Sequence, residues 1–347
     1  MRRALDFLPP KILTAVVLAA AILAASCSTD TEALPTSTPA AEPAAAPEST
    51  MPAGAVVPLA GGPEGIVVTS SGIAAVGVRG PDGIRLLDAA TGAERAFVPT
   101  SGAPRHLSLA GPDGPVLAPL EQTDELLSVD PATGAVLDLV ADVGRQPHDA
   151  VAVSDGTIVV TNEMGGGVVF VRDGKVASSL PPGPVQPGGV AAVGDLAAVA
   201  DVQGNGIWIY GGEKLVTQAP LGTKLTHALS LGGDLAAFAD TDGGAVFIER
   251  IGRDVSEIAR IETPGKPYGL AFDPRRQLLL ITLTESNVLR AVDIADPAAP
   301  RWVADIPTVR QPNSVAVDPV SGSVLVTGSD PGDDSSVQII PAGSIGP

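Results

Sequence analysis

Histidine is rare in this chain, and two of its three histidines occupy equivalent places in a repeated pattern. His148 and His227 each directly follow a turn-setting residue and precede a short apolar run. An acidic residue stands at the end of the next apolar run of a repeat, as Glu163, Asp201 and Asp240 show. An imidazole beside a carboxylate can act as a general acid or base, and the two together can ligate a divalent metal ion.

A divalent metal ion is one hypothesis for these residues, and a solvated polar surface is the other. His148 and His227 lie in different repeats, and the chain has no short His-x-x-His spacing. Such a spacing would place two ligands on one local element, as in many zinc sites. The choice between the hypotheses therefore depends on whether the fold brings these residues together.

The pattern that contains the two histidines occurs seven times. Each copy has a turn-setting residue, a variable residue, a residue that is usually small, and a short apolar run. The turn-setting residues are Pro63, Pro104, Pro147, Pro187, Thr226, Pro267 and Pro312, spaced 39 to 45 residues apart. A period of about 40 residues carried on short strands is typical of a β-propeller with four strands per blade.

The content of one repeat supports four strands per unit. In the first repeat, the apolar runs are residues 66–68, 73–78, 84–87 and 95–98, separated by turns rich in glycine, proline and aspartate. The chain contains 40 Gly and 33 Pro, and helical periodicity is absent beyond the first 27 residues. The sequence thus predicts an all-β fold, a seven-bladed β-propeller with four antiparallel strands per blade. A solenoid is the alternative for any repeat, but seven four-strand units favour a closed ring.

The ends of the repeat region predict how the ring closes. The seventh repeat has strands near residues 314–317, 324–327 and 337–340, and its fourth strand is missing. Residues 55–60 form an apolar segment that has no blade of its own. We expect this N-terminal segment to supply the outer strand of the last blade, because that pairing removes two open sheet edges.

The first 26 residues are predicted to be a lipoprotein signal peptide. A positively charged start precedes the apolar residues 12–25, which are fewer than the roughly 20 that a membrane span needs. Small residues then precede Cys27, the only cysteine, in a pattern that resembles the bacterial lipobox. This resemblance implies cleavage before Cys27 and lipidation of its side chain. An ordinary secretory signal with a chance cysteine is the alternative.

Composition divides the remainder into a tether and a domain. Residues 27–54 are rich in Pro, Ala, Ser and Thr without apolar periodicity, so we expect a disordered tether before the propeller domain of residues 55–347. The net charge of −18 disfavours binding to nucleic acid and direct adhesion to anionic lipid. Lipid on Cys27 would therefore anchor the protein to the outer face of the cell membrane, where we expect a monomer. An envelope protein or a small molecule is the expected partner.

Three phrases resemble the YVTN-repeat, YncE-like propellers. They are Asp-Pro-Ala-Thr-Gly-Ala-Val at 130–136, Val-Val-Thr-Asn at 159–162 and Gln-Pro-Asn-Ser-Val-Ala-Val-Asp at 311–318. The resemblance covers residues 55–345 and implies a seven-bladed propeller. That superfamily neighbours lactonase-type and streptogramin-lyase-type propellers, but the phrases describe turns and strands and imply no particular activity.

The whole chain also resembles an actinobacterial lipoprotein family that includes mycobacterial LppL. The shared features are the lipobox and tether, followed by residues 52–59, 267–271 and 307–316. This resemblance implies a palmitate-carrying lipoprotein of the cell envelope and no established reaction.

Propeller geometry gathers the variable residues at one place. The first strand of a blade leaves one face of the ring and the second strand returns to it. The residue after each turn-setting residue therefore shares a face with the turn between the second and third strands. The candidate ligand-binding residues at this channel mouth are Glu64, Arg105, His148, His227, Tyr268, Asn313, Glu163, Asp201 and Asp240. Convergent polar groups in a concave funnel indicate a binding site, although a wet channel mouth would carry polar residues in any case.

Two functions fit these expectations. The first is a non-enzymatic surface lipoprotein whose propeller presents a binding face. The second is a metal-assisted lyase or lactonase, with His148 or His227 as general acid or base and Glu163 near it. The chain contains no Gly-x-Ser-x-Gly, phosphate loop, His-Glu-x-x-His or redox cysteine pair, so no catalytic residue is assigned. We expect the third histidine, His106, to face a blade interface.

Overall fold

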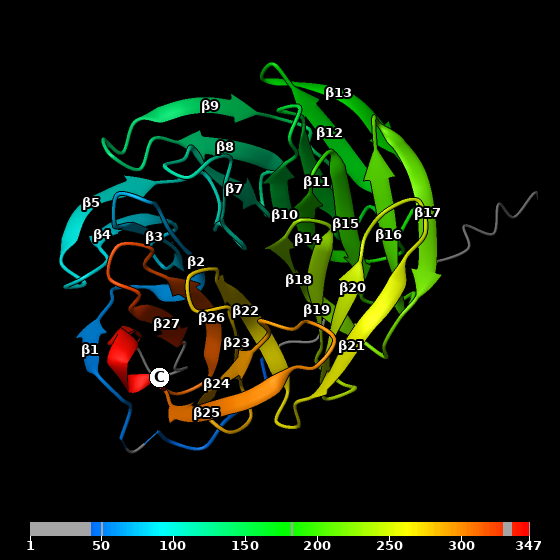
Figure 1. The fold of residues 1–347 in the computed structure, drawn as a ribbon. Helices are drawn as coiled ribbons and strands as arrows, with labels where there is room; N and C mark the ends of the chain where they lie inside the picture. The colour runs from blue at the N-terminus through cyan, green and yellow to red at the C-terminus, as the bar shows by residue number, and fades with distance from the viewer. Residues whose placement is uncertain (1–42, 50, 182, 329–334, 347) are drawn as a thin grey trace, which may run out of the picture. The chain divides into compact units, whose positions relative to one another are not determined.

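The computed structural model describes residues 43–49, 51–181, 183–328 and 335–346. The predicted signal peptide, Cys27 and the first part of the predicted tether lie outside these residues. Seven four-stranded antiparallel sheets surround a common centre, with the first strand of each sheet innermost (Figure 1). The predicted seven-bladed propeller is therefore confirmed. No helix in the described ranges is both long and apolar enough to span a membrane.

Each of the first six blades consists of four strands that are consecutive in sequence. Blade one has β2 (Gly62–Val68), β3 (Ile73–Arg79), β4 (Gly83–Asp88) and β5 (Glu94–Pro99). Blade two has β6 (Ser108–Leu109), β7 (Val116–Leu120), β8 (Glu125–Val129) and β9 (Val136–Val140). Blade three has β10 (Pro147–Ala152), β11 (Ile158–Asn162), β12 (Val168–Arg172) and β13 (Lys175–Leu180). Blade four has β14 (Pro187–Val193), β15 (Leu196–Asp201), β16 (Gly206–Gly211) and β17 (Lys214–Pro220).

The last three blades follow the same order until the chain ends. Blade five has β18 (Leu225–Gly232), β19 (Leu235–Asp240), β20 (Ala245–Arg250) and β21 (Ser256–Glu262). Blade six has β22 (Pro267–Asp273), β23 (Leu278–Leu283), β24 (Val288–Asp293) and β25 (Arg301–Pro307). Blade seven has β26 (Pro312–Val317), β27 (Val324–Gly328), β28 (Ser336–Ile340) and the N-terminal β1 (Ala55–Pro58), and a short 3-10 helix η1 (Ala342–Ser344) follows.

The N-terminal strand closes the ring, as the sequence predicts. β1 pairs antiparallel with β28, with Val57 opposite Val337. Directly after β1, the backbone N–H of Leu59 donates to the carbonyl of Ser335. The chain therefore joins its two ends within one sheet, and β28 is not left as an open edge.

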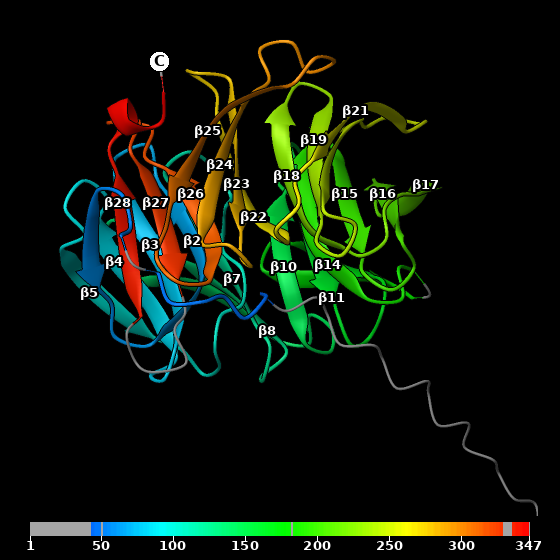
Figure 2. The same ribbon diagram turned by 90° about the horizontal axis from the view of Figure 1, so that it is seen from below.

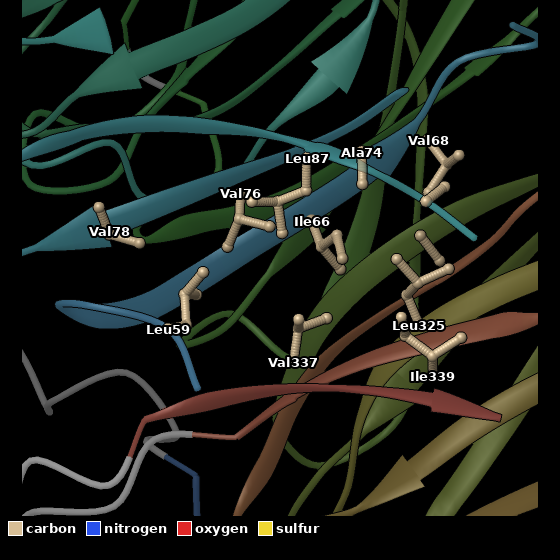
Figure 3. Close-up of a cluster of buried hydrophobic side chains, with 12 residues drawn as sticks. Leu59, Ile66, Val68, Ala74, Val76, Val78, Leu87, Leu325, Val337 and Ile339 are labelled. Atoms are coloured by element: carbon tan, nitrogen blue, oxygen red, sulfur yellow. The ribbon is translucent and has the colours of Figure 1, made fainter. Parts of the chain in front are cut away.

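Each pair of adjacent blades encloses one cluster of apolar side chains. The cluster between blades one and seven includes Leu59, Ile66, Val76, Val337 and Ile339 (Figure 3). The described residues form seven such clusters, one for each interface around the ring. Middle strands bury side chains on both faces, which explains why their sequences are continuous apolar runs instead of alternating ones.

A β-bulge lies at or directly after each turn-setting residue. In blade three, Pro147 lies opposite Asn162 but Ala150 lies opposite Val160, so the inner strand carries one extra residue. The same shift occurs in the other blades, including blade two, where Pro104 bridges Leu120 ahead of the short strand β6. A bulge leaves residues unpaired and re-aims their side chains. The bulge therefore turns the variable residues toward the channel.

Residues 43–49 and 51–53 contact the propeller, although composition assigns them to the tether. Their backbone carbonyls accept hydrogen bonds from side chains of blades six and seven. The donors are Asn287 to Pro47, Arg310 to Ala46, Gln311 to Pro43 and Gln338 to Ala53. The segment, blue in Figure 2, follows the face on which the inner strands begin.

The closure can be tested by shortening one side chain. Leu59 is 6% exposed within the cluster that joins the first and last blades, so Leu59→Ala leaves a cavity there. We expect Leu59→Ala to lower the free energy of unfolding by about 2–4 kcal/mol, measured by urea denaturation. Val56→Ala is the matched control, because Val56 lies on β1 but is 45% exposed. Equal stability of Leu59→Ala and the parent would contradict this closure.

Candidate functional site at the channel mouth

A chain of ion pairs joins blades one and two at the channel mouth. Arg79, at the end of β3, places Nε 3.0 Å from Glu64 Oε1 and Nη2 3.0 Å from Glu121 Oε2. Arg105 Nε lies 3.6 Å from the other oxygen of Glu121. Glu121 and Arg105 are buried, whereas Arg79 and Glu64 are partly exposed. The mouth thus presents charged groups of both signs at the border between solvent and the channel.

His148 and Glu163 form a buried pair next to these ion pairs. His148 Nδ1 lies 3.0 Å from Glu163 Oε2, and the side-chain amide of Gln186 donates to Glu163 Oε1 at 3.1 Å. Burial by itself would raise the pKa of Glu163. The interactions with His148 and Arg105 outweigh burial and lower the pKa of Glu163 to about 2. Glu163 is therefore a carboxylate at neutral pH and fixes the orientation of the His148 ring.

All three histidines meet on the channel axis. The ring centroids of His106 and His148 are 4.5 Å apart, and those of His106 and His227 are also 4.5 Å apart. The Nε2 atoms of His106 and His227 approach to 3.0 Å, which is hydrogen-bond distance for two imidazoles that share one proton. Tyr268 packs edge-on against His227 at a centroid distance of 4.3 Å. The fold therefore brings His148, His227 and Tyr268 together.

Burial holds the axial imidazoles in their neutral form. It is the main reason that the pKa values of His106 and His227 are both lowered, and the neighbouring histidines add to the effect. Asp149, whose carboxylate lies 3.9 Å from His106 Nδ1, partly opposes the shift at His106. His227 Nδ1 is buried and has no hydrogen-bond partner among the described residues.

Asp201 and Asp240 have a different role from the central cluster. Both carboxylates are buried and accept backbone N–H groups of adjacent loops. The donors are Val185, Gln186 and Gly204 for Asp201, and Thr223, Lys224 and Gly243 for Asp240. These carboxylates hold the loops at the mouth in place, and their oxygens already carry hydrogen bonds.

Asn313 links the last blade to the first. Its side-chain amide donates to the carbonyl of Pro63, and its carbonyl oxygen accepts from Thr327. Asn313 thus lies at the mouth as the sequence places it, and its side-chain hydrogen bonds join two blades.

Sequence reasoning placed His106 wrongly and overlooked Asp149. We expected His106 to face a blade interface, but its ring stacks on His227 and lines the channel. His106 and Asp149 both occupy the second place after a turn-setting residue, where Gly65, Gly189 and Gly269 stand in other blades. A charged or imidazole side chain at a place that is usually small was the signal available in the sequence.

Three residues at the mouth carry side-chain atoms of the kinds that ligate divalent metal ions. Ligand atoms of Glu121, His148 and Glu163 lie within 4.8 Å of one another, and all three residues are buried. Two carboxylate oxygens and one imidazole nitrogen are a set that zinc accepts. Each donor already has a protein partner, however, since Arg79 bonds to Glu121 and His148 bonds to Glu163. A metal ion would have to replace some of these contacts.

Comparison with solved structures reveals the same fold in proteins with different roles. A streptogramin B lyase matches with a TM-score of 0.67 and 17% identity, over 83% of this chain and 97% of that one. A catalytically inactive histidine-to-alanine variant of virginiamycin B lyase from Staphylococcus aureus, with quinupristin, has a TM-score of 0.68 and 16% identity, over 82% and 98%. The WD40 repeats of RRP9 match with a TM-score of 0.70 and 14% identity, over 85% and 100%.

These similarities establish the propeller fold alone, because the identities are low. No protein-family model matches the chain, and a search of curated proteins finds no match.

The His148–Glu163 pair predicts an acid-dependent loss of stability. The pKa of Glu163 is about 2 when folded, below the 4.5 of a free glutamate, so its contribution is present above pH 4.5 and disappears between pH 4.5 and 2. We expect Glu163→Gln to lower the free energy of unfolding by on the order of 2–3 kcal/mol at pH 7, and by less as the pH falls from 4.5 to 2. Urea denaturation at several pH values measures the difference.

Glu285→Gln is the matched control, since Glu285 lies in the corresponding turn of blade six and is exposed. If Glu163→Gln lowered the free energy of unfolding by the same amount at every pH, the assignment of a carboxylate paired with His148 would be contradicted.

Proposed function

We propose that this protein is an exported lipoprotein, anchored by lipid on Cys27, whose propeller binds a polar ligand or envelope partner at the channel mouth. The observation that carries the proposal is the gathering of buried Arg105, Glu121, His148 and Glu163 at one end of the channel. Burying charged side chains costs free energy, and stability alone is often better served by apolar groups. Such a cluster at a concave surface favours recognition of a ligand with complementary charges.

The path of the N-terminal segment is consistent with an anchored binding face. Ala44 N–H donates to Thr284 Oγ1, and Gln311 donates to the carbonyl of Pro43, so this segment lies on the mouth side. A lipid on Cys27 would thus be connected to the domain through the same face that carries the ligand site. A partner in the envelope would meet this face close to the membrane.

A second candidate is a lyase or lactonase, and the His148–Glu163 contact favours it. A carboxylate that accepts from His148 Nδ1 leaves Nε2 as the nitrogen that can take a proton, as in other histidine bases. In a metal-assisted form of the reaction His148 would be a ligand and not the base: a divalent metal ion held by Glu121, His148 and Glu163 would polarise a substrate oxygen. Solved neighbours that are named as lyases have the same fold, which makes the reaction class a reasonable one to test.

The binding proposal is tested by crosslinking on intact cells that carry the full-length protein. We expect wild-type protein to capture an envelope component, and Arg105→Ala to lose it because the buried guanidinium at the mouth is removed. Arg301→Ala is the matched control, since the Arg301 side chain is 76% exposed on the outer strand β25. Cys27→Ala should move the protein from the membrane to the soluble fraction. Equal capture by Arg105→Ala would contradict a mouth-centred site.

The enzyme candidate is tested with quinupristin and added Mg²⁺ or Zn²⁺. A lyase gives a product of unchanged mass, whereas a hydrolase adds one water, so mass spectrometry distinguishes the two reactions. We expect any conversion to disappear in His148→Ala. Absence of product with the wild-type protein would count against this candidate for that substrate, and conversion by His148→Ala would place the reaction elsewhere.

A further inference from the structure

A separate cavity of about 380 Å³ occupies the channel beyond the imidazole cluster. Its walls come from the inner strands of all seven blades. At one end it reaches His106 and His227, and at the other it reaches Val68 and Val317, where β2 and β26 end. The cavity therefore extends toward the face opposite the charged mouth. Its volume lies within the range of small-molecule sites, which is roughly 300–1,000 Å³.

The imidazole pair separates this cavity from the mouth. His106 belongs to blade two and His227 to blade five, so the two side chains come from blades that are not neighbours. Their Nε2 atoms meet at 3.0 Å, and Tyr268 from blade six packs against His227. A small molecule in the cavity would thus meet a hydrogen-bonding floor and would not reach the ion pairs at the mouth.

Most residues that line the cavity have apolar side chains, although a large share of the exposed lining is polar. Val151, Ala192, Leu229 and Phe272 are among the lining residues, and no described lining residue is Lys or Arg. The one carboxylate, Asp149, is occupied by the backbone N–H groups of Ala150 and Val190. An anion in this cavity would find a negative charge and no counter-ion, so the cavity favours an uncharged ligand.

We propose that this cavity is a binding site for a neutral small molecule that has both apolar and polar groups. The molecule enters from the face where the inner strands end and places a polar group against the His106–His227 pair. The apolar part of the molecule contacts the strand side chains. This site is separate from the polar site at the mouth, and either one can be absent without affecting the other.

Two fluorescent probes that share one skeleton test the charge preference. N-phenyl-1-naphthylamine is neutral, and 8-anilino-1-naphthalenesulfonate adds a sulfonate to the same rings. We expect the full chain carrying Cys27→Ala, which has no lipid to bind the probe, to bind the neutral probe saturably and at least about tenfold more tightly than the anionic one. Equal affinity for the two probes, or no saturable binding of the neutral one, would overturn the proposal.

Filling the cavity tests its location in the same background. Ala192 lines the cavity and is half-buried, so Ala192→Phe should weaken the neutral probe by about tenfold or more. Ala132→Phe, at an exposed turn, should leave its affinity unchanged. Circular dichroism checks that each variant is folded, and Val67→Trp replaces Ala192→Phe if the latter does not fold. Unchanged affinity in a folded cavity-filling variant would contradict this location.

Discussion

The structure depends on burying both faces of every blade. A four-stranded sheet whose middle strands are apolar on both sides is stable only between two neighbours, so the ring must be complete. The pairing of β1 with β28 completes it, and Leu59 extends this closure into the apolar cluster between the first and last blades. All other features, including the channel and its two ends, require this closed ring.

Within the closed ring, the β-bulge determines which side chains reach the channel. One extra residue at or after each turn-setting residue interrupts the pairing, and it frees two positions in blades one, three, four and six. Where both positions are small, the inner strands of neighbouring blades approach closely, as at Gly189, where an added Cβ would lie 2.6 Å from Ala228 N. Where they carry His148 or His106, the same geometry brings imidazoles to the axis. The β-bulge thus allows close packing of the inner strands in some blades and directs imidazole side chains into the channel in others.

The sequence predicted the fold almost completely, because its signals are local and repeated. Each strand or turn is specified by its own turn residues or apolar run, and the N-terminal segment at 55–60 specifies the closing strand. Seven copies of the pattern make its period clear. The meeting of His148 with Glu163 also followed from strand direction alone.

Contacts between blades two and five could not be predicted, because His106 and His227 are far apart in sequence and meet only across the axis. The hydrogen bonds from backbone N–H groups to Asp201 could not be predicted either, because they depend on loop geometry that composition does not specify.

The attachment of residues 43–49 and 51–53 to blades six and seven has a mechanical consequence. A pull transmitted along the chain from its N-terminal side reaches the hydrogen bonds from Gln311, Arg310 and Asn287 before it reaches β1. Those bonds are separate from the pairing of β1 with β28, so breaking them leaves that pairing intact. The hydrogen bonds of this segment therefore bear part of the force before it reaches the β1–β28 pairing that closes the ring.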